Sequence, residues 1–193
     1  MIFKAGIRVF LISILVLSIY SICHFQLGNA QTENWKRYND PGQKFTFLYP
    51  PNWAVNSTHN DANGYTEATL TNPNSTRMKV SVIYNPNDSS LDPNSKSVVL
   101  SRQLADLEDQ ISVDYFFFNS TGQFTHKYSI QNLSSASDVI DFEKIEGRPG
   151  KMLLILSKAT DTDSLLFTYT ESKRSFYKGL DTVSMIIKSV ATK

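Results

Sequence analysis

Acidic side chains are the first residues of this sequence that could do chemistry, because several fall close together. Asp138, Asp141, Glu143 and Glu146 lie within nine residues, and a hard cation such as calcium takes several oxygen ligands of this kind. On a strand, Asp141 and Glu143 would share one face while Asp138 and Glu146 would share the other. The four carboxylates would then not converge, so the spacing favours a charged strand edge that blocks aggregation.

A second acidic pair, Asp161 and Asp163, stands in a predicted hairpin loop. The residues after this pair lack the Asp/Asn-Gly step and the distant Glu of a calcium-binding loop. We therefore expect a polar turn at this position.

Histidines are the other candidate metal ligands. Beyond the first thirty residues there are two, His59 and His126. A zinc or copper site needs ligands that converge, and the sequence offers neither a His-x-x-His pair nor a cysteine in this part. We expect both histidines to be solvated or hydrogen-bonded at the surface. The weak metal candidates are Asp138, Asp141, Glu143 and His126.

Patterns of covalent catalysis are missing from the sequence. There is no Gly-x-Ser-x-Gly element, and neither histidine has a recognisable catalytic partner in the sequence. No glycine-rich phosphate loop or dinucleotide fingerprint occurs. A paired-carboxylate glycosidase stays open on spacing alone. We predict no catalytic residue, no cofactor and no enzymatic activity.

The first thirty residues are typical of a secretory leader. Lys4 and Arg8 precede the apolar run 9–23, and Gly28-Asn29-Ala30 places small residues where a signal peptidase cleaves. The sequence predicts a signal peptide or an N-terminal membrane anchor over 1–30, with cleavage before Gln31. A lipidated Cys23 is a third reading, disfavoured because no small residue precedes it. The protein is expected outside the cytoplasm, secreted or held at the outer face of the membrane.

The remaining residues 31–193 are predicted to form one domain. A chain of this length can bury a complete core without covalent staples. Two of the 19 basic residues lie in the leader, which leaves 17 against 18 acidic ones. This balance gives no reason to expect nucleic acid as a partner. The only cysteine also lies in the leader, so packing must hold the domain together.

Five Asn-x-Ser/Thr sequons make the chain a candidate glycoprotein if the host has the machinery. They are Asn56, Asn74, Asn87, Asn119 and Asn132.

Alternating apolar residues predict a series of strands. Four strand-and-turn units in the first part suggest an antiparallel meander, with a proline corner at Pro50-Pro51 and a sharp turn over 147–150. The predicted strands cover residues 44–49, 53–58, 65–71, 77–84, 124–130, 138–145, 151–158 and 165–170. The last two are expected to pair as a hairpin, and 152–156 is apolar at every position, as in a strand covered on both faces.

Two segments carry the helical period. Leu100, Leu104, Leu107 and Ile111 are spaced 4, 3 and 4, which predicts a helix over 95–111 with its N-cap at Ser95 or Ser97. A second stripe begins at Phe176 and ends at Val190. Two helices with one apolar stripe each, beside a sheet apolar on both faces, predict an α/β/α sandwich with an antiparallel sheet and one helix on each face.

Aromatic residues supply a further candidate contact. Phe116, Phe117 and Phe118 cannot all face one core in a strand or a helix, so at least one is expected near the surface or in a partner groove. The competing reading is a buried element whose exposed ring a neighbouring loop covers. Trp35 and Trp53 are expected to be packing anchors.

The order of these elements resembles that of PsbP-type domains, named after an extrinsic protein of the oxygen-evolving photosystem. The similarity begins with Tyr38, the segment 45–50 and Trp53, and ends with 145–149, a hairpin, Phe176 and the segment 185–190. It extends over about residues 35–190 and implies an α/β/α sandwich around an antiparallel sheet. It implies no reaction. The lysine- and histidine-bearing extension by which photosystem members dock and support calcium and chloride retention has no counterpart here, so only the fold carries over.

Together these features predict a non-enzymatic extracytoplasmic binding or assembly domain of PsbP-like fold. Its partner would be an unknown protein or small ligand at the cell surface, with membrane contact through an uncleaved leader. Two alternatives stay open: an envelope enzyme that uses a metal or a small ligand through the acidic cluster or His126, and a structural glycosylated surface protein.

Overall fold

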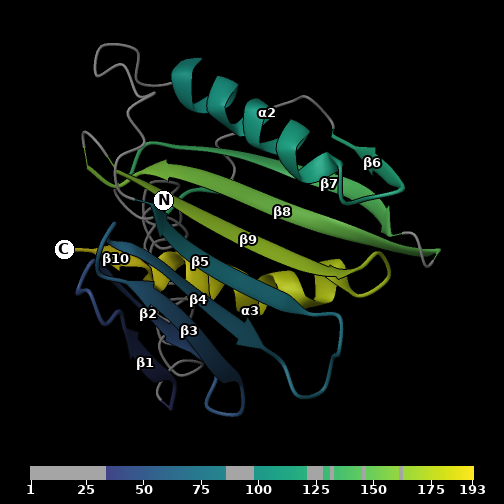
Figure 1. The fold of residues 1–193 in the computed structure, drawn as a ribbon. Helices are drawn as coiled ribbons and strands as arrows, with labels where there is room; N and C mark the ends of the chain where they lie inside the picture. Colours follow the sequence, from purple (N-terminus) through teal and green to yellow (C-terminus); the bar gives the residue numbers. More distant parts are fainter. Residues whose placement is uncertain (1–33, 86–97, 121–127, 131–132, 145–146, 161–162) are drawn as a thin grey trace, which may run out of the picture. The chain divides into compact units, whose positions relative to one another are not determined.

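The computed structural model describes residues 34–85, 98–120, 128–130, 133–144, 147–160 and 163–193. The chain divides into two compact units, residues 1–36 and 37–193, and the second holds nearly all of the described residues. The elements below follow the labels of Figure 1.

A seven-stranded antiparallel sheet forms the centre of the second unit, in the order β3-β4-β5-β9-β8-β7-β6 (Figure 1). Its strands are β3 Ala54–Asn60, β4 Tyr65–Thr71, β5 Lys79–Asn85, β6 Phe117–Asn119, β7 Ser135–Lys144, β8 Arg148–Lys158 and β9 Ser164–Ser172. The predicted hairpin of the last two long strands is confirmed, with Ile155 opposite Phe167.

A smaller sheet is formed by β1 Lys36–Asn39, β2 Phe45–Tyr49 and β10 Ala191–Thr192, in the order β1-β2-β10. The predicted four-unit meander is therefore wrong in its first member, because β2 pairs with the end of the chain. Ala191 lies opposite Thr46. On β2, the rings of Phe45 and Phe47 are fully buried.

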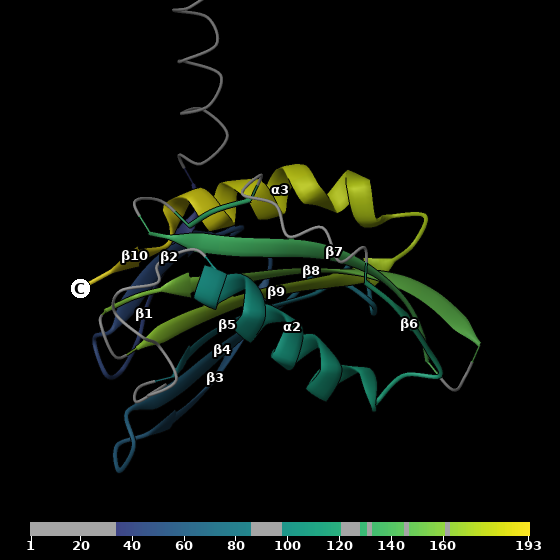
Figure 2. The same cartoon turned by 90° about the horizontal axis from the view of Figure 1, so that it is seen from above.

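The two predicted helices are confirmed and lie on opposite sides of the large sheet (Figure 2). Helix α2, Val98–Ser112, packs on β7 and β8. Helix α3, Phe176–Ser189, packs on β9 and on β2. Neither helix combines the length and the apolarity that crossing a membrane requires, and this holds only for the described residues.

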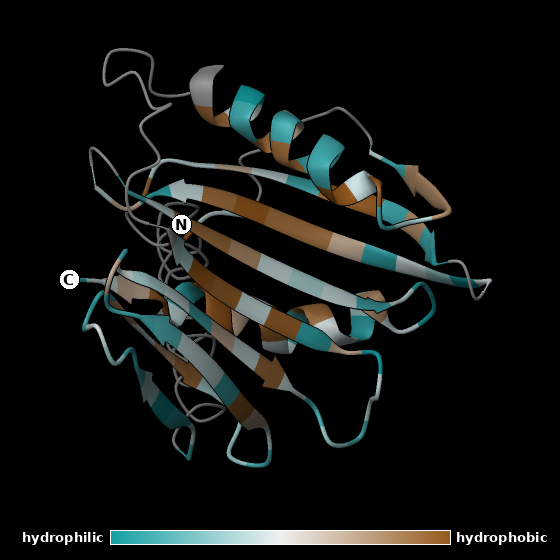
Figure 3. Cartoon of the chain, in the orientation of Figure 1, coloured by the Kyte–Doolittle hydropathy of each residue, from teal (hydrophilic) through white to brown (hydrophobic). Residues whose placement is uncertain are grey.

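Burial on the α2 side follows the predicted stripe. Leu100 and Leu104 are buried against even-numbered residues of β7 and β8, which share one face of the pleated sheet. These residues include Ile140, Met152 and Leu154. The middle of β8 is accordingly hydrophobic along the strand, whereas the outward turns of α2 are polar (Figure 3).

The α3 side holds the larger aromatic core. Tyr169 of β9 is fully buried, stacks on Phe176 with ring centroids 4.8 Å apart, and donates its hydroxyl to the Phe176 carbonyl at 2.9 Å. Val183 and Ile186 of α3 are fully buried on the same side. A sheet buried on both faces explains the continuous apolar run in β8.

Two local expectations need correction, and a third is not tested. Residues 128–130 form no strand, and the rest of the predicted strand 124–130 lies outside the described residues. The turn expected over 147–150 is shorter, because Arg148 already opens β8, while Gly147 takes the left-handed backbone (φ 71°). The N-cap positions Ser95 and Ser97 lie outside the described residues.

Candidate functional site

A groove of about 490 Å³ opens beside the C-terminal end of α2. On this face α2 runs over β7 and β8 and leaves β9 and β5 uncovered (Figure 1). Its floor comes from β8 and β9, one wall from the end of α2 and the strand β7, and the other wall from the start of β5. The residues that line it include Arg77, Lys79, Ile111, Tyr115, Phe142, Lys144, Arg148, Gly150, Met152, Thr168, Thr170 and Glu171.

Strand register brings these residues to one place. Lys79 pairs with Thr170, and Thr170 pairs with Met152, so the three form a row across β5, β9 and β8. Gly150 and Phe142 form part of the next row, and Arg148 with Lys144 closes the β7–β8 hairpin. The alternation of the pleat places all of them on the face that carries α2.

Four exposed basic side chains surround the groove. Arg77 and Lys79 stand on the β5 side, and Lys144 and Arg148 stand on the hairpin side. Arg77, Lys79 and Lys144 form no ion pair with any other described residue. Their positive charge is therefore available to an incoming anion.

One carboxylate, Glu171, also lines the groove, but the protein itself occupies both of its oxygens. The Ser75 hydroxyl donates to Oε2 at 2.9 Å, and the backbone N–H of Ser172 donates to Oε1 at 2.7 Å. With three cations outside any ion pair against one hydrogen-bonded carboxylate, the groove favours anionic ligands.

The wall formed by β7 and the segment after α2 is apolar and aromatic. The ring of Phe142 lies directly over Gly150, where a Cβ atom would come within 2.7 Å of the ring carbon Cε2. Tyr115 packs on Phe142 and on Phe118, with centroid separations of 4.8 and 5.8 Å. Burial, with a smaller contribution from Asp114, raises the pKa of Tyr115, so its ring presents a neutral phenol.

Beyond this wall, the aromatic run ends in exposed side chains. Phe118 packs inward, whereas Phe116 is 80% and Phe117 is 50% exposed. The expectation that at least one of these rings lies near the surface is met. Val113, directly after α2, is also exposed.

Asp141, predicted as a weak metal candidate, is held in ion pairs instead. Lys151 Nζ lies 2.6 Å and Lys173 Nζ 3.2 Å from its carboxylate oxygens. Partial burial works to raise the pKa of Asp141, but the two lysines outweigh it and hold that pKa below its usual value. The negative charge of Asp141 is thus balanced by two lysines of the protein itself.

The other metal candidates do not gather around Asp141. Asp138 is buried on the opposite, α2-facing side of β7, where the Ser120 hydroxyl donates to it at 2.6 Å. Glu143 shares the Asp141 face but pairs in register with Phe117. His126 and Glu146 lie outside the described residues. Across the described ranges, no three histidine, cysteine or acidic side chains stand close enough to hold a metal.

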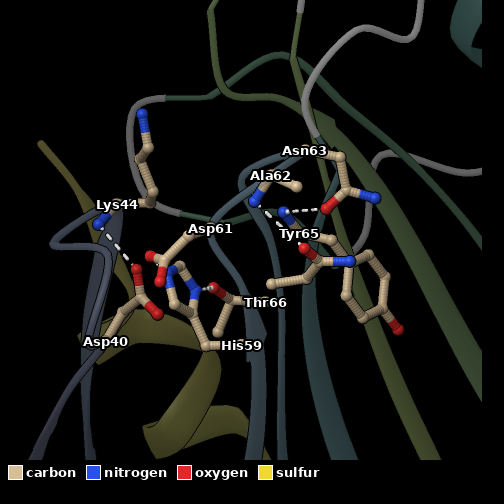
Figure 4. Close-up of polar contacts among 9 residues, drawn as sticks. Asp40, Lys44, His59, Asp61, Ala62, Asn63, Tyr65 and Thr66 are labelled. Atoms are coloured by element: carbon tan, nitrogen blue, oxygen red, sulfur yellow. Dashed lines mark hydrogen bonds and ion pairs between the residues drawn. The ribbon is translucent and has the colours of Figure 1, made fainter.

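His59 has two partners that sequence reasoning missed. Its Nδ1 lies 2.6 Å from the Thr66 hydroxyl and its Nε2 lies 2.8 Å from Asp61 Oδ1 (Figure 4). This hydroxyl–imidazole–carboxylate chain has the composition of a nucleophilic triad. Thr66 is fully buried, however, while Asp61 is 98% exposed, so the hydroxyl cannot meet a substrate. These hydrogen bonds instead tie together the two strands of the β3–β4 hairpin.

The loop before β2 packs against this histidine. A Cβ atom on Gly42 would lie 2.7 Å from His59 Cε1, so the loop can approach the ring only as glycine. Asp40 closes the same loop by accepting the Lys44 backbone N–H at 2.8 Å (Figure 4). These contacts give His59 a structural role in the packing of this loop on the hairpin.

Three of the five sequons are described, and all three asparagines are exposed. Asn56 lies on β3, Asn74 in the turn after β4, and Asn119 on β6. Asn87 and Asn132 lie outside the described residues.

No protein-family model matches this sequence, and no curated protein matches it. Solved structures do match. The cyanobacterial PsbP of Synechocystis sp. PCC 6803 has a TM-score of 0.53 at 14% identity, over 82% of this chain and 92% of that one. LpqN of Mycobacterium tuberculosis, described as involved in cell envelope biogenesis, has a TM-score of 0.51 at 13% identity, over 83% and 92%. The Ran-binding protein Mog1p of Saccharomyces cerevisiae has a TM-score of 0.51 at 10% identity, over 82% and 95%.

At identities this low, the likeness shows the fold alone. The chain has a PsbP-like α/β/α sandwich, and the resemblance drawn from the sequence is confirmed at this level. No functional residue is carried over from any of these proteins.

Proposed function

We propose that this protein is a non-enzymatic binding domain that acts outside the cytoplasm, and that the basic groove is its ligand site. The observation that carries the proposal is the groove itself: a recess with four basic side chains around an aromatic and aliphatic wall. A concave, partly apolar site with a few charged groups is the usual form of a binding pocket.

The chemistry of the described residues supports binding over catalysis. The Thr66 hydroxyl, which is hydrogen-bonded to His59, is buried, and the Asp141 carboxylate is paired with two lysines. The groove contributes cations and aromatic rings, which are suited to holding a ligand.

The description of one structural neighbour is consistent with a binding role, and that of another with a setting at the cell envelope. Mog1p is described as Ran-binding, and LpqN as involved in cell envelope biogenesis. These descriptions belong to those proteins, and the fold similarity makes a binding role a reasonable analogy for this chain.

The groove can be tested by titrating the purified exported protein, labelled with ¹⁵N, with sets of anionic, neutral and cationic small molecules. We expect anionic compounds to shift the backbone amides of Lys79, Met152 and Thr170. The double variant Lys79→Gln with Lys144→Gln should lose these shifts. Lys178→Gln with Lys188→Gln removes the same charge from α3 and serves as the control. Compounds that shift amides elsewhere and never in the groove would refute this assignment.

The setting outside the cytoplasm rests on the leader composition of residues 1–30. Fusing residues 1–34 to a reporter enzyme that folds only after export should give active reporter. Replacing Leu11, Leu15 and Leu17 with Asp should abolish that activity. The intact mass of the exported protein then separates a cleaved product beginning at Gln31 from an uncleaved anchor. Inactive reporter retained in the cytoplasm would overturn the proposed setting.

Glycosylation of the exposed sequons is part of the same proposal. Peptide mass spectrometry of the exported protein should find glycan on Asn56, Asn74 or Asn119 if the host modifies sequons.

A further inference from the structure

The four cations of the groove form two pairs rather than one cluster. Arg77 and Lys79 stand at the start of β5, while Lys144 and Arg148 stand where β7 passes into β8. Strands β9 and β8 separate β5 from β7 in the sheet order. Across the sheet the pairs are two to three strands apart, at about 4.8 Å per strand, and along the strands they are displaced by two to four residues of about 3.3 Å each. Their backbones are therefore roughly 12–20 Å apart.

This separation suits a ligand with two separated negative charges. An extended peptide rises about 3.3 Å per residue, and its residues i, i+2 and i+4 point to one side. Carboxylates at i and i+4 are therefore about 13 Å apart. Because lysine and arginine side chains are long and flexible, both basic pairs can reach carboxylates with this spacing. A single phosphate is too small to reach both pairs.

Between the basic pairs, the groove presents apolar surface. Met152 lies in the row between Lys79 and β7, and Phe142 and Tyr115 form the aromatic wall beside it. An apolar side chain at i+2 of the peptide would face this surface.

We propose that the occupant of the groove is an extended acidic segment of a partner protein. The segment would carry carboxylates at i and i+4 and an aromatic or aliphatic side chain at i+2. This inference rests on the proposed function of the groove and names the class of ligand that the groove takes.

An anionic membrane surface fits less well. The basic side chains surround a recess instead of forming one plane, and successive residues of β6 point to opposite sides of the sheet. Phe117 also lies opposite Glu143 in register, so a carboxylate stands beside the exposed ring. An anionic bilayer would meet repulsion there.

The experiment uses the peptide acetyl-SDSFSDS-amide against the ¹⁵N-labelled exported protein. The isosteric control acetyl-SNSFSNS-amide removes both charges. The spacing control acetyl-SSDDSFS-amide keeps composition and charge but places the carboxylates side by side. We expect the first peptide to shift the groove amides and to bind about tenfold more tightly than either control, with weaker binding as salt rises.

Protein variants locate the binding. Lys79→Gln with Lys144→Gln removes one charge from each pair and should weaken binding about fivefold, as expected for two partly exposed ion pairs. Lys178→Gln with Lys188→Gln should leave the affinity unchanged. Circular dichroism of each variant checks that these exposed substitutions leave the fold intact.

Each alternative has its own outcome. Equal affinity for the three peptides, or affinity unchanged by the groove variant, would overturn the proposal. If inorganic phosphate alone, or vesicles rich in phosphatidylglycerol, shift the groove amides while the peptide does not, the acidic-segment proposal fails and the groove remains a ligand site. If none of the peptides, phosphate or vesicles shifts a groove amide, both the acidic-segment proposal and the proposed ligand site are refuted.

Discussion

Glu108 is the charged side chain whose burial has the clearest consequence. It stands on α2, is buried against the sheet, and hydrogen bonds with Ser120 and Asp138. Burial is the largest cause that raises the pKa of Glu108 to about 7, and the nearby charges of Asp138 and Asp109 raise it further. A hydrogen bond with the Ser120 hydroxyl opposes this shift.

This pKa predicts a stability that depends on pH. Because the folded state holds the Glu108 proton more tightly than the unfolded chain, the free energy of unfolding should fall as pH rises from about 4.5 to about 7. One pKa unit corresponds to about 1.4 kcal/mol, and partial solvation reduces the full effect, so we expect a loss of about 1–2 kcal/mol. Urea unfolding between pH 4.5 and pH 8 measures it.

The variant Glu108→Gln isolates this contribution. Its amide can still donate to Asp138 but does not titrate, so Glu108→Gln should be more stable than wild type at pH 8 and show a flatter profile. Asp106→Asn, an exposed change on the same helix, should keep the wild-type profile. The lowered pKa of Asp141 acts in the opposite sense, and only at pH values below its usual one. A Glu108→Gln profile parallel to wild type would contradict the assignment.

At the scale of elements, Gly179 sets how closely α3 approaches the sheet. An alanine at an ordinary helix position stabilises by about 1 kcal/mol over glycine. Here the added Cβ would collide with the Tyr169 hydroxyl and lie 2.8 Å from Met78 Cε. Since Tyr169 is fully buried and cannot move aside, Gly179→Ala should lower the free energy of unfolding by about 1–3 kcal/mol.

A double-mutant cycle checks the cause. In a Tyr169→Phe background the colliding oxygen is gone, so the added cost of Gly179→Ala should shrink. Lys178→Ala, one position away and exposed, should change stability by less than about 0.5 kcal/mol. A stabilised Gly179→Ala protein would show that α3 does not lie against Tyr169.

The elements that the sequence predicted well are those long enough to show a repeating apolar pattern. Helix α2 follows the stripe of Leu100 and Leu104, and β8 follows its continuous apolar run. The elements β1, β6 and β10 were not predicted, because two to four residues are too short to show a period. For β10, the pairing of Ala191 with Thr46 depends on where helix α3 ends in space.

The groove could not be predicted from the sequence. Lys79 and Lys144 are more than sixty positions apart in the chain, and they meet at one groove only because β9 and β8 lie between their strands. Periodicity predicts which face a side chain takes, but it does not give the order of strands in the sheet. The partners of His59 were missed for a similar reason, since the hairpin register places Thr66 opposite it.

On the scale of the whole molecule, the two halves of the chain are joined through the centre of the sheet. Strand β5 from the first half pairs with β9 from the second, with Val82 opposite Phe167. The small sheet is tied to the same core through α3, because the Ser189 hydroxyl accepts the Leu48 backbone N–H at 2.8 Å and donates to the Ile186 carbonyl. The small sheet therefore shares the core on the α3 side of the large sheet.

This connectivity predicts a single cooperative unfolding transition. Trp53 is buried just after β2, and Trp35→Phe leaves it as the sole tryptophan. In that background, Trp53 fluorescence and far-ultraviolet circular dichroism should give the same urea midpoint. Ser189→Ala leaves the Leu48 N–H without its acceptor, so both midpoints should fall together, by about 1 kcal/mol in stability. If Ser189→Ala lowered only the fluorescence midpoint, the small sheet would unfold separately and the shared core would be refuted.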